Sequence, residues 1–220
     1  MPRSSKGGLA AALLLFALPL VAAQPYHLQL EANPAAPFPF LGKFGTVTID
    51  VYPGGVRAET LLMNGFSRNG AAAITVENPL TRIASNEPLA GIAATLQKLG
   101  RVDVDTSAVP SRAPDVAGKV GGITATRHRL VYGPTAWIDV WTTTAIPENP
   151  QFRAVAMEIV RGLAPGTAAA MRTIPGTPLY VELNFRRYKN VALLRLKSFV
   201  PNNEGEESAL KVGRLYFFAP

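Results

Sequence analysis

The chain has 220 residues, a formal net charge of +7 and no cysteine. The absence of cysteine excludes disulfides, thiolate metal sites, iron–sulfur clusters and thiol nucleophiles. A composition with 48% hydrophobic and 17% charged residues is typical of a globular protein and excludes a disordered chain.

The first 23 residues have the pattern of an export signal. Arg3 and Lys6 form a basic start, residues 9–20 are an apolar core, and small residues at 21–23 match a cleavage site. The core is too short for a membrane-spanning helix, which needs about 20 apolar residues. We therefore expect cleavage after Ala23 and a periplasmic location; the alternative is an uncleaved anchor. Because no cysteine follows the core, the sequence excludes lipidation of the new N-terminus.

Residues 24–220 then suit a single domain that is long enough to bury a hydrophobic core. Without Arg3 and Lys6 the formal charge falls from +7 to +5. This excess favours weak attraction to anionic surfaces such as phospholipid headgroups, and the alternative is scattered surface charge. Nucleic acid is not an expected partner, because no run of basic and aromatic residues forms a stacking platform. Any membrane contact is expected to be peripheral.

Alternating hydrophobic and polar residues predict half-buried antiparallel strands. The clearest is 46–52, in which Val47, Ile49 and Val51 share one face. Glycine-containing turns at 53–55 and 69–70 predict hairpins on either side of the next strand. The Pro- and Gly-rich residues 108–122 predict a loop. The full set of predicted strands is 26–31, 46–52, 56–63, 72–76, 123–132, 137–143, 179–186, 191–200 and 210–218.

Two stretches have helical periodicity instead. Residues 86–100 have Asn86 to cap a helix, Pro88 for its first turn and Gly100 to end it. Residues 150–163 follow Asn149 as a cap and carry an apolar stripe on one face. A short additional helix is expected at 164–172.

Few residues have the spacing of a catalytic or metal site. The only histidines are His27 and His128, and no paired histidine or His–Glu motif occurs, so we expect no metal and no cofactor. Residues 103–107 resemble a fragment of a calcium loop but lack the glycine and the closing glutamate. His128 would need an orienting partner to act as a base. Asp139 on the next predicted strand is the candidate, and a purely structural histidine is the alternative, so no catalytic residue is assigned.

Arg127 and Arg129 are basic residues in the middle of an otherwise apolar strand face. On adjacent antiparallel strands they can pair with Asp139. An interior pair is costly and would mark a position that faces a ligand. The alternative is a weak ion pair on the solvent face.

Aromatic and aliphatic side chains of one strand and one helix are candidates to line a pocket. The two tryptophans share one face of strand 137–143, and the helix at 150–163 can cover them with its apolar stripe. The alternative is an ordinary sheet–helix core. With the two arginines of the preceding strand, the candidate ligand-binding residues are Trp137, Trp141, Phe152, Val155, Ile159, Arg127 and Arg129.

The order of these elements and several short motifs resemble a known family. The motifs are Gly-Gly-Ile-Thr-Ala-Thr-Arg-His at 121–128, Trp-Ile-Asp-Val-Trp-Thr-Thr at 137–143, Asn-Pro at 149–150 and Pro-Gly-Thr-Pro-Leu at 175–179. Over residues 46–200 the chain resembles exported bacterial domains of unknown function that are related to the lipoprotein-localisation carriers and their outer-membrane receptor. The resemblance implies an α+β fold, with a strongly curved antiparallel sheet, a half-open β-barrel, and helices covering its concave side. It carries over no catalytic residue, and the ligand-gating arginine of the carriers has no clear counterpart in this sequence.

We therefore predict a non-enzymatic periplasmic protein that binds an apolar or lipid-like ligand between the sheet and the helices at 88–99 and 150–163. Its expected partners are a lipid or lipoprotein acyl chain, or an envelope protein. The alternative is a structural or protein-interaction module at the cell envelope with a filled core. A third hypothesis is an enzyme built on His128, Arg127, Arg129 and Asp139.

Overall fold

The computed structural model describes residues 24–33, 45–61, 63–99, 107–185, 188–202, 205 and 207–218. The predicted export signal lies outside these residues, as does most of the calcium-loop fragment. No helix among the described residues has both the length and the apolar character that crossing a bilayer requires.

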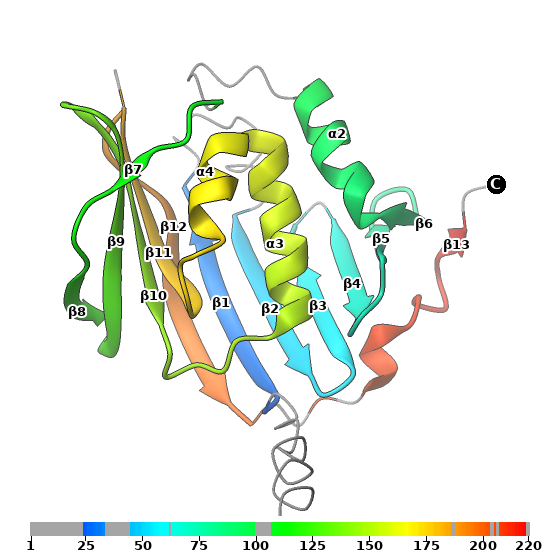
Figure 1. Ribbon diagram of the computed structural model, residues 1–220. Coiled ribbons are helices and arrows are strands. Elements are labelled where there is room, and N and C mark those ends of the chain that lie inside the picture. The colour runs from blue at the N-terminus through cyan, green and yellow to red at the C-terminus, as the bar shows by residue number, and fades with distance from the viewer. Residues whose placement is uncertain are drawn as a thin grey trace, which may run out of the picture.

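The strands form one curved, mostly antiparallel sheet, and the helices lie on one of its faces (Figure 1). Along the sheet the strand order is β13-β6-β5-β4-β3-β2-β1-β12-β11-β10-β9-β7, and β8 pairs with β9. The strands are β1 (Tyr26–Ala32), β2 (Thr46–Tyr52), β3 (Gly55–Glu59), β4 (Asn64–Arg68), β5 (Ala73–Asn78), β6 (Ile83–Pro88), β7 (Ser111–Arg112), β8 (Val116–Val120), β9 (Ile123–Gly133), β10 (Ala136–Thr143), β11 (Thr177–Phe185), β12 (Tyr188–Pro201) and β13 (Phe217–Phe218). The helices are α2 (Leu89–Leu99), α3 (Pro150–Leu163), α4 (Pro165–Met171) and the 3₁₀ turn η1 (Glu207–Leu210).

The alternating segments of the sequence form the centre of the sheet. In β1, Leu28 is paired with Ile49 of β2 on one side and with Phe199 of β12 on the other. Leu28, Ile49 and Val51 are almost fully buried and belong to the main hydrophobic cluster, against which Phe152 of α3 also packs. The period-two pattern therefore predicted both the strands and their buried face correctly.

The second predicted helix, α3, is confirmed at both ends. Asn149 caps it, because its Oδ1 accepts a hydrogen bond from the Phe152 amide at 2.8 Å, and Pro150 is the first helical residue. At the same end, the Gln151 side chain donates to the Ser67 hydroxyl at 2.7 Å and accepts from the Gly70 amide at 3.0 Å. These contacts hold the start of α3 against β4 and the following turn.

The predicted start of the first helix is wrong. Asn86 and Pro88 belong to strand β6, and α2 begins at Leu89. Asn86 faces Thr75 of β5, and the two side chains are hydrogen-bonded at 2.8 Å. Pairing with the preceding strand β5 therefore takes precedence over helix capping at this residue.

Three further predictions of strands and loops are corrected. Residues 64–68 form β4, although Asn-Gly-Phe-Ser-Arg has no alternating pattern, and the predicted strand 56–63 ends at Glu59. The predicted loop at 108–122 contains β7 and β8, both paired with β9. Of the predicted strand 210–218, only β13 is a strand, and it pairs in parallel with β6.

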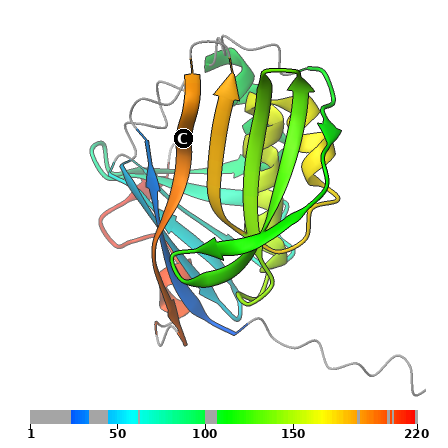
Figure 2. The same cartoon turned by 90° about the vertical axis from the view of Figure 1, so that its left-hand side faces the viewer.

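The β8–β9 hairpin folds across the sheet and reaches β12 (Figure 2). A Cβ atom built on Gly118 would lie 2.6 Å from the Trp141 ring, and one on Gly121 would lie 3.2 Å from the Leu196 side chain. Trp141 is thus packed beneath this hairpin. Glycine at 118 is needed because any side chain there would displace the indole.

Candidate functional site

The two faces of β9 and β10 have different surroundings. Val140 and Leu130 form a buried cluster with Ile174, against which Ala170 and Met171 of α4 pack. Since successive side chains in a strand point to opposite faces, Asp139 and its alternating neighbours in β10 point away from α4. Trp137, Trp141, Arg127 and Arg129 therefore lie on the face away from α4, although Trp141 also packs against the main hydrophobic cluster.

On the face away from α4, Arg129 and Asp139 form a two-pronged ion pair. Arg129 Nε and Nη2 each lie 2.7 Å from a different Asp139 carboxylate oxygen, and the guanidinium stacks 4.1 Å from the Trp137 ring centre. The hydrogen bonds from Arg129 to Asp139 raise the pKa of Arg129. Asp139 is only 4% exposed, whereas the Arg129 side chain is 30% exposed. The pair is thus half-buried, between the two alternatives that the sequence left open.

His128 does not meet Asp139, which corrects one expectation from the sequence. Its partner across β10 is Val140, so the ring lies on the opposite face from Asp139. There, Nε2 lies 3.0 Å from the Thr142 hydroxyl, and Nδ1 lies 2.9 Å from both the Asp115 carboxylate and Arg112 Nη2. The four-residue enzyme constellation of the third hypothesis is therefore not assembled.

The contacts of Asp115 predict an acid-dependent loss of stability. Desolvation opposes ionisation, but hydrogen bonds from His128 and Arg112 hold the Asp115 pKa below its usual range. A lowered pKa in the folded state stabilises the fold above the unfolded-state pKa and loses that effect as pH falls through the folded-state pKa. Urea unfolding below about pH 4 should therefore show lower stability than at pH 7, and Asp115→Asn should reduce the difference. An unchanged pH dependence in the variant would contradict this role.

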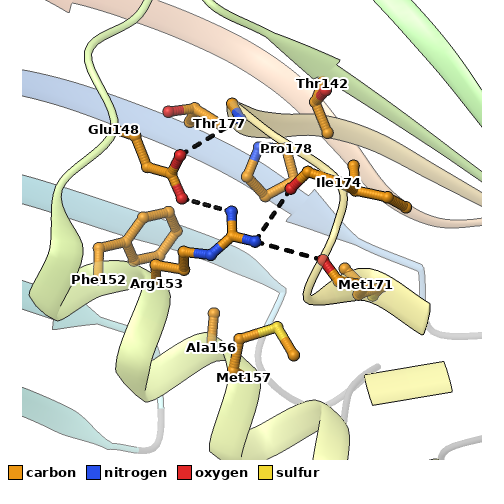
Figure 3. Close-up of a pocket in the computed structure, with 11 residues that line it drawn as sticks. Thr142, Glu148, Phe152, Arg153, Ala156, Met157, Met171, Ile174, Thr177 and Pro178 are labelled. Atoms are coloured by element: carbon orange, nitrogen blue, oxygen red, sulfur yellow. Dashed lines mark hydrogen bonds and ion pairs between the residues drawn. The ribbon is translucent and has the colours of Figure 1, made fainter. Parts of the chain in front are cut away.

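A small apolar pocket lies between α3, α4 and the sheet (Figure 3). Its volume is about 40 Å³, and it adjoins a shallow open depression of about 460 Å³. The apolar part of its lining consists of Phe152, Ala156, Met157, Met171, Ile174 and Pro178. Methionine side chains adapt readily to different shapes, so this lining suits a variable apolar group.

Arg153 of α3 forms hydrogen bonds with the segment between α4 and β11, which forms one wall of the pocket. Arg153 Nη2 donates to the carbonyl oxygens of Met171, Arg172 and Ile174 at 3.3, 3.1 and 3.0 Å. Its Nη1 lies 2.5 Å from the Glu148 carboxylate (Figure 3). The last carbonyl groups of a helix lack hydrogen-bond donors within the helix. Here the Arg153 guanidinium is the donor for carbonyl groups at and just after the end of α4.

Glu148, the ion-pair partner of Arg153, also binds the turn between α4 and β11. Its second carboxylate oxygen accepts a hydrogen bond from the Gly176 amide at 3.3 Å. Gly176 has a φ of +87°, and a Cβ there would lie 2.6 Å from the Thr143 carbonyl oxygen. The turn between α4 and β11 can therefore sit this close to β10 only with glycine at this position.

The mouth of the pocket is charged while its interior is apolar. The adjoining depression is lined by Glu148, Pro150, Arg153, Arg172, Thr173, Ile174 and Pro175. Glu148 and Arg153 neutralise each other, whereas the exposed Arg172 adds a positive charge. Such an arrangement suits a ligand with an apolar end and a polar or anionic remainder.

Of the seven candidate ligand-binding residues, Phe152 alone lines this pocket. Val155 and Ile159 lie further along α3, where Ile159 is 36% exposed. The two tryptophans and the two arginines do not line it, although Trp141 packs against the same main hydrophobic cluster as Phe152. Their assignment as ligand-binding residues stays a prediction. Glu148, Arg153 and Met171 were not predicted from the sequence, because nothing in their spacing reveals that the α4–β11 turn returns to α3.

Comparisons with known proteins leave the family open. No protein-family model matches the chain, and no curated protein matches it. The chain is similar in structure to an uncharacterised conserved protein from Thermus thermophilus, with a TM-score of 0.49, 11% sequence identity and 90% of each chain covered. It is also similar to MucB, solved in complex with MucA(peri), with a TM-score of 0.39 and 10% identity, over 88% of this chain and 56% of that one. At these scores neither likeness bears on function, which has to be derived from this chain's own residues.

Proposed function

We propose that this chain is a non-enzymatic, exported binding module that accepts an apolar group between α3 and the sheet. In this proposal the sheet acts as a half-open barrel whose concave side faces the helices. The observation that supports the proposal most strongly is the apolar pocket beneath α3, which opens beside Arg153 and Arg172.

The size of the pocket limits what enters it. A volume of about 40 Å³ admits the tip of an acyl chain. Complete small-molecule sites in proteins measure about 300–1,000 Å³. A longer acyl chain therefore requires α3 and α4 to move away from the sheet, against the contacts of Arg153.

The same small volume favours a second candidate, a protein-interaction module whose core stays filled. The two candidates differ in one measurable respect. Extraction of the purified native protein with organic solvent, followed by mass spectrometry, should release a lipid if the first is correct. Absence of any co-purified lipid, together with no displacement of a fluorescent fatty-acid probe, would favour the second.

Filling the pocket should abolish binding of an apolar ligand. Ala156 faces the pocket from α3, so Ala156→Leu places three more carbon atoms in it. We expect affinity for decanoate, measured by calorimetry, to fall by a factor of at least about ten, which corresponds to ~1.4 kcal/mol. Ala169→Leu on α4 is the matched control, because Ala169 is exposed and does not line the pocket. Equal affinities for the two variants would place the ligand elsewhere.

A further inference from the structure

A second surface of the molecule lies at the opposite edge of the sheet from β7. Strand β13 is the last strand there, paired with β6, and both its residues are aromatic (Figure 1). Phe217 is 74% exposed and Phe218 is 56% exposed. Large side chains that are this exposed are unusual when they are grouped together.

The aromatic residues are joined by aliphatic ones from the same two segments. Phe217 is paired with Ile83, and its amide donates to the Arg82 carbonyl oxygen at 3.0 Å. The turns before β6 and β13 add Leu80 and Leu215. The exposed hydrophobic residues of this edge, called the apolar edge below, are Leu80, Ile83, Leu215, Phe217 and Phe218.

Basic residues are interleaved with this apolar edge. Arg82, Lys211 and Arg214 are all exposed. The segments 79–84 and 211–218 contain these three basic residues and no aspartate or glutamate. The edge is therefore both apolar and positively charged, although the two segments are far apart in the sequence.

We propose that the apolar edge is a peripheral binding surface for anionic phospholipid bilayers. Exposed phenylalanine and leucine side chains enter the boundary between headgroups and acyl chains, while arginine and lysine contact the phosphates. The net charge, +7 for the whole chain and +5 without Arg3 and Lys6, has the same sign and adds long-range attraction. A bilayer offers both the phosphates that these basic residues match and the acyl region that the five exposed hydrophobic side chains can enter. This surface does not depend on the pocket beneath α3, so either proposal can fail alone.

Vesicle flotation tests this proposal with the full chain. Parent and variants share one N-terminus, so any contribution of residues 1–23 is the same in all of them. We expect binding to phosphatidylglycerol-containing vesicles and little binding to pure phosphatidylcholine vesicles. Raising NaCl from about 0.05 to 0.5 M should release the protein, because salt screens the phosphate contacts.

Two sets of variants separate the charged and apolar contributions. The triple variant Arg82→Gln/Lys211→Gln/Arg214→Gln should bind anionic vesicles about 100-fold more weakly, since each basic residue contributes about fivefold. The double variant Phe217→Ser/Phe218→Ser should bind at least about tenfold more weakly even at low salt. Lys189→Gln and Val109→Ser are matched controls, because both residues are exposed and lie outside the apolar edge. Thermal unfolding of each variant should match that of the parent, because the substituted side chains are exposed.

A tryptophan placed in the surface reports insertion directly. Phe217→Trp should gain a blue-shifted emission component with anionic vesicles, quenched by brominated acyl chains, over the background of Trp137 and Trp141. Equal binding to neutral and anionic vesicles would overturn the proposal. So would a dimer that forms through the apolar edge and does not bind vesicles, detected by light scattering and abolished by Phe217→Ser/Phe218→Ser.

Discussion

Replacing Arg57 with methionine should destabilise the protein by about 3–5 kcal/mol, because the change leaves a buried carboxylate without its partner. Glu77 is 0% exposed, and its Oε2 lies 2.8 Å from Arg57 Nη2. Its Oε1 accepts from the Gly213 amide at 2.9 Å, while Arg57 Nη1 donates to the Ala209 carbonyl oxygen at 3.0 Å. This group therefore holds the C-terminal segment against β3 and β5.

Two further variants separate loss of a partner from loss of a charge. Glu59 also contacts Arg57, at 2.7 Å, but its side chain is 45% exposed, so Glu59→Gln should cost less than about 1 kcal/mol. Adding Glu77→Met to Arg57→Met should recover part of the lost stability, since the uncompensated charge is then removed. Urea unfolding at pH 7, followed by circular dichroism, measures all of these differences. Equal losses for Glu59→Gln and Arg57→Met would refute the role of Glu77.

Replacing Arg153 with methionine should loosen the closure of the pocket and lower the free energy of unfolding by about 2–3 kcal/mol. The variant loses hydrogen bonds from a charged donor to three carbonyl groups, and such bonds contribute about 1.5–3 kcal/mol each before solvent exposure is considered. The Arg153 side chain is 30% exposed, so water can replace part of what is lost. Arg172→Met is the matched control, because the Arg172 side chain is exposed, and it should change stability by less than about 0.5 kcal/mol.

Hydrogen exchange distinguishes local opening from global destabilisation in the Arg153 variant. We expect exchange to accelerate first at residues 171–177, which follow the lost contacts, while the centre of β1 stays protected. Decanoate affinity should fall as well, because the same residues close the pocket. Uniform acceleration of hydrogen exchange over the whole sheet would show that Arg153 stabilises the fold as a whole and does not specifically hold residues 171–177.

The central strands and α3 could be predicted from the sequence because their information is local. Alternation at 46–52 and the Asn149 cap each need only neighbouring residues. In contrast, β4 and β8 lack alternation and are strands only because a partner strand lies beside them. Asn86 shows the same limit, since its residue type suits a helix cap and a cross-strand hydrogen bond equally well.

The pocket was the least predictable feature. Its apolar wall includes Phe152, which the helical stripe did indicate, but its closure depends on Arg153 and on backbone carbonyl groups after α4. A carbonyl group has no sequence signature, so no pattern of residues could reveal this contact. The placement of both tryptophans away from α4 follows from strand alternation, once the position of α4 is known.

The two edges of the sheet bear on how the protein avoids aggregation. A long open strand invites a strand from another molecule to pair with it. Here the eleven-residue strand β9 is shared between β7 and β8, and in the described part of the chain the sheet path ends in two-residue strands, β7 and β13. At the β13 end the last strand offers only two residues of backbone to a further strand, whereas at the other end the five-residue strand β8 pairs, among the described strands, only with β9 and is the longer open edge. Gly118 and the exposed Lys119 in the middle of β8 disfavour the addition of another strand there.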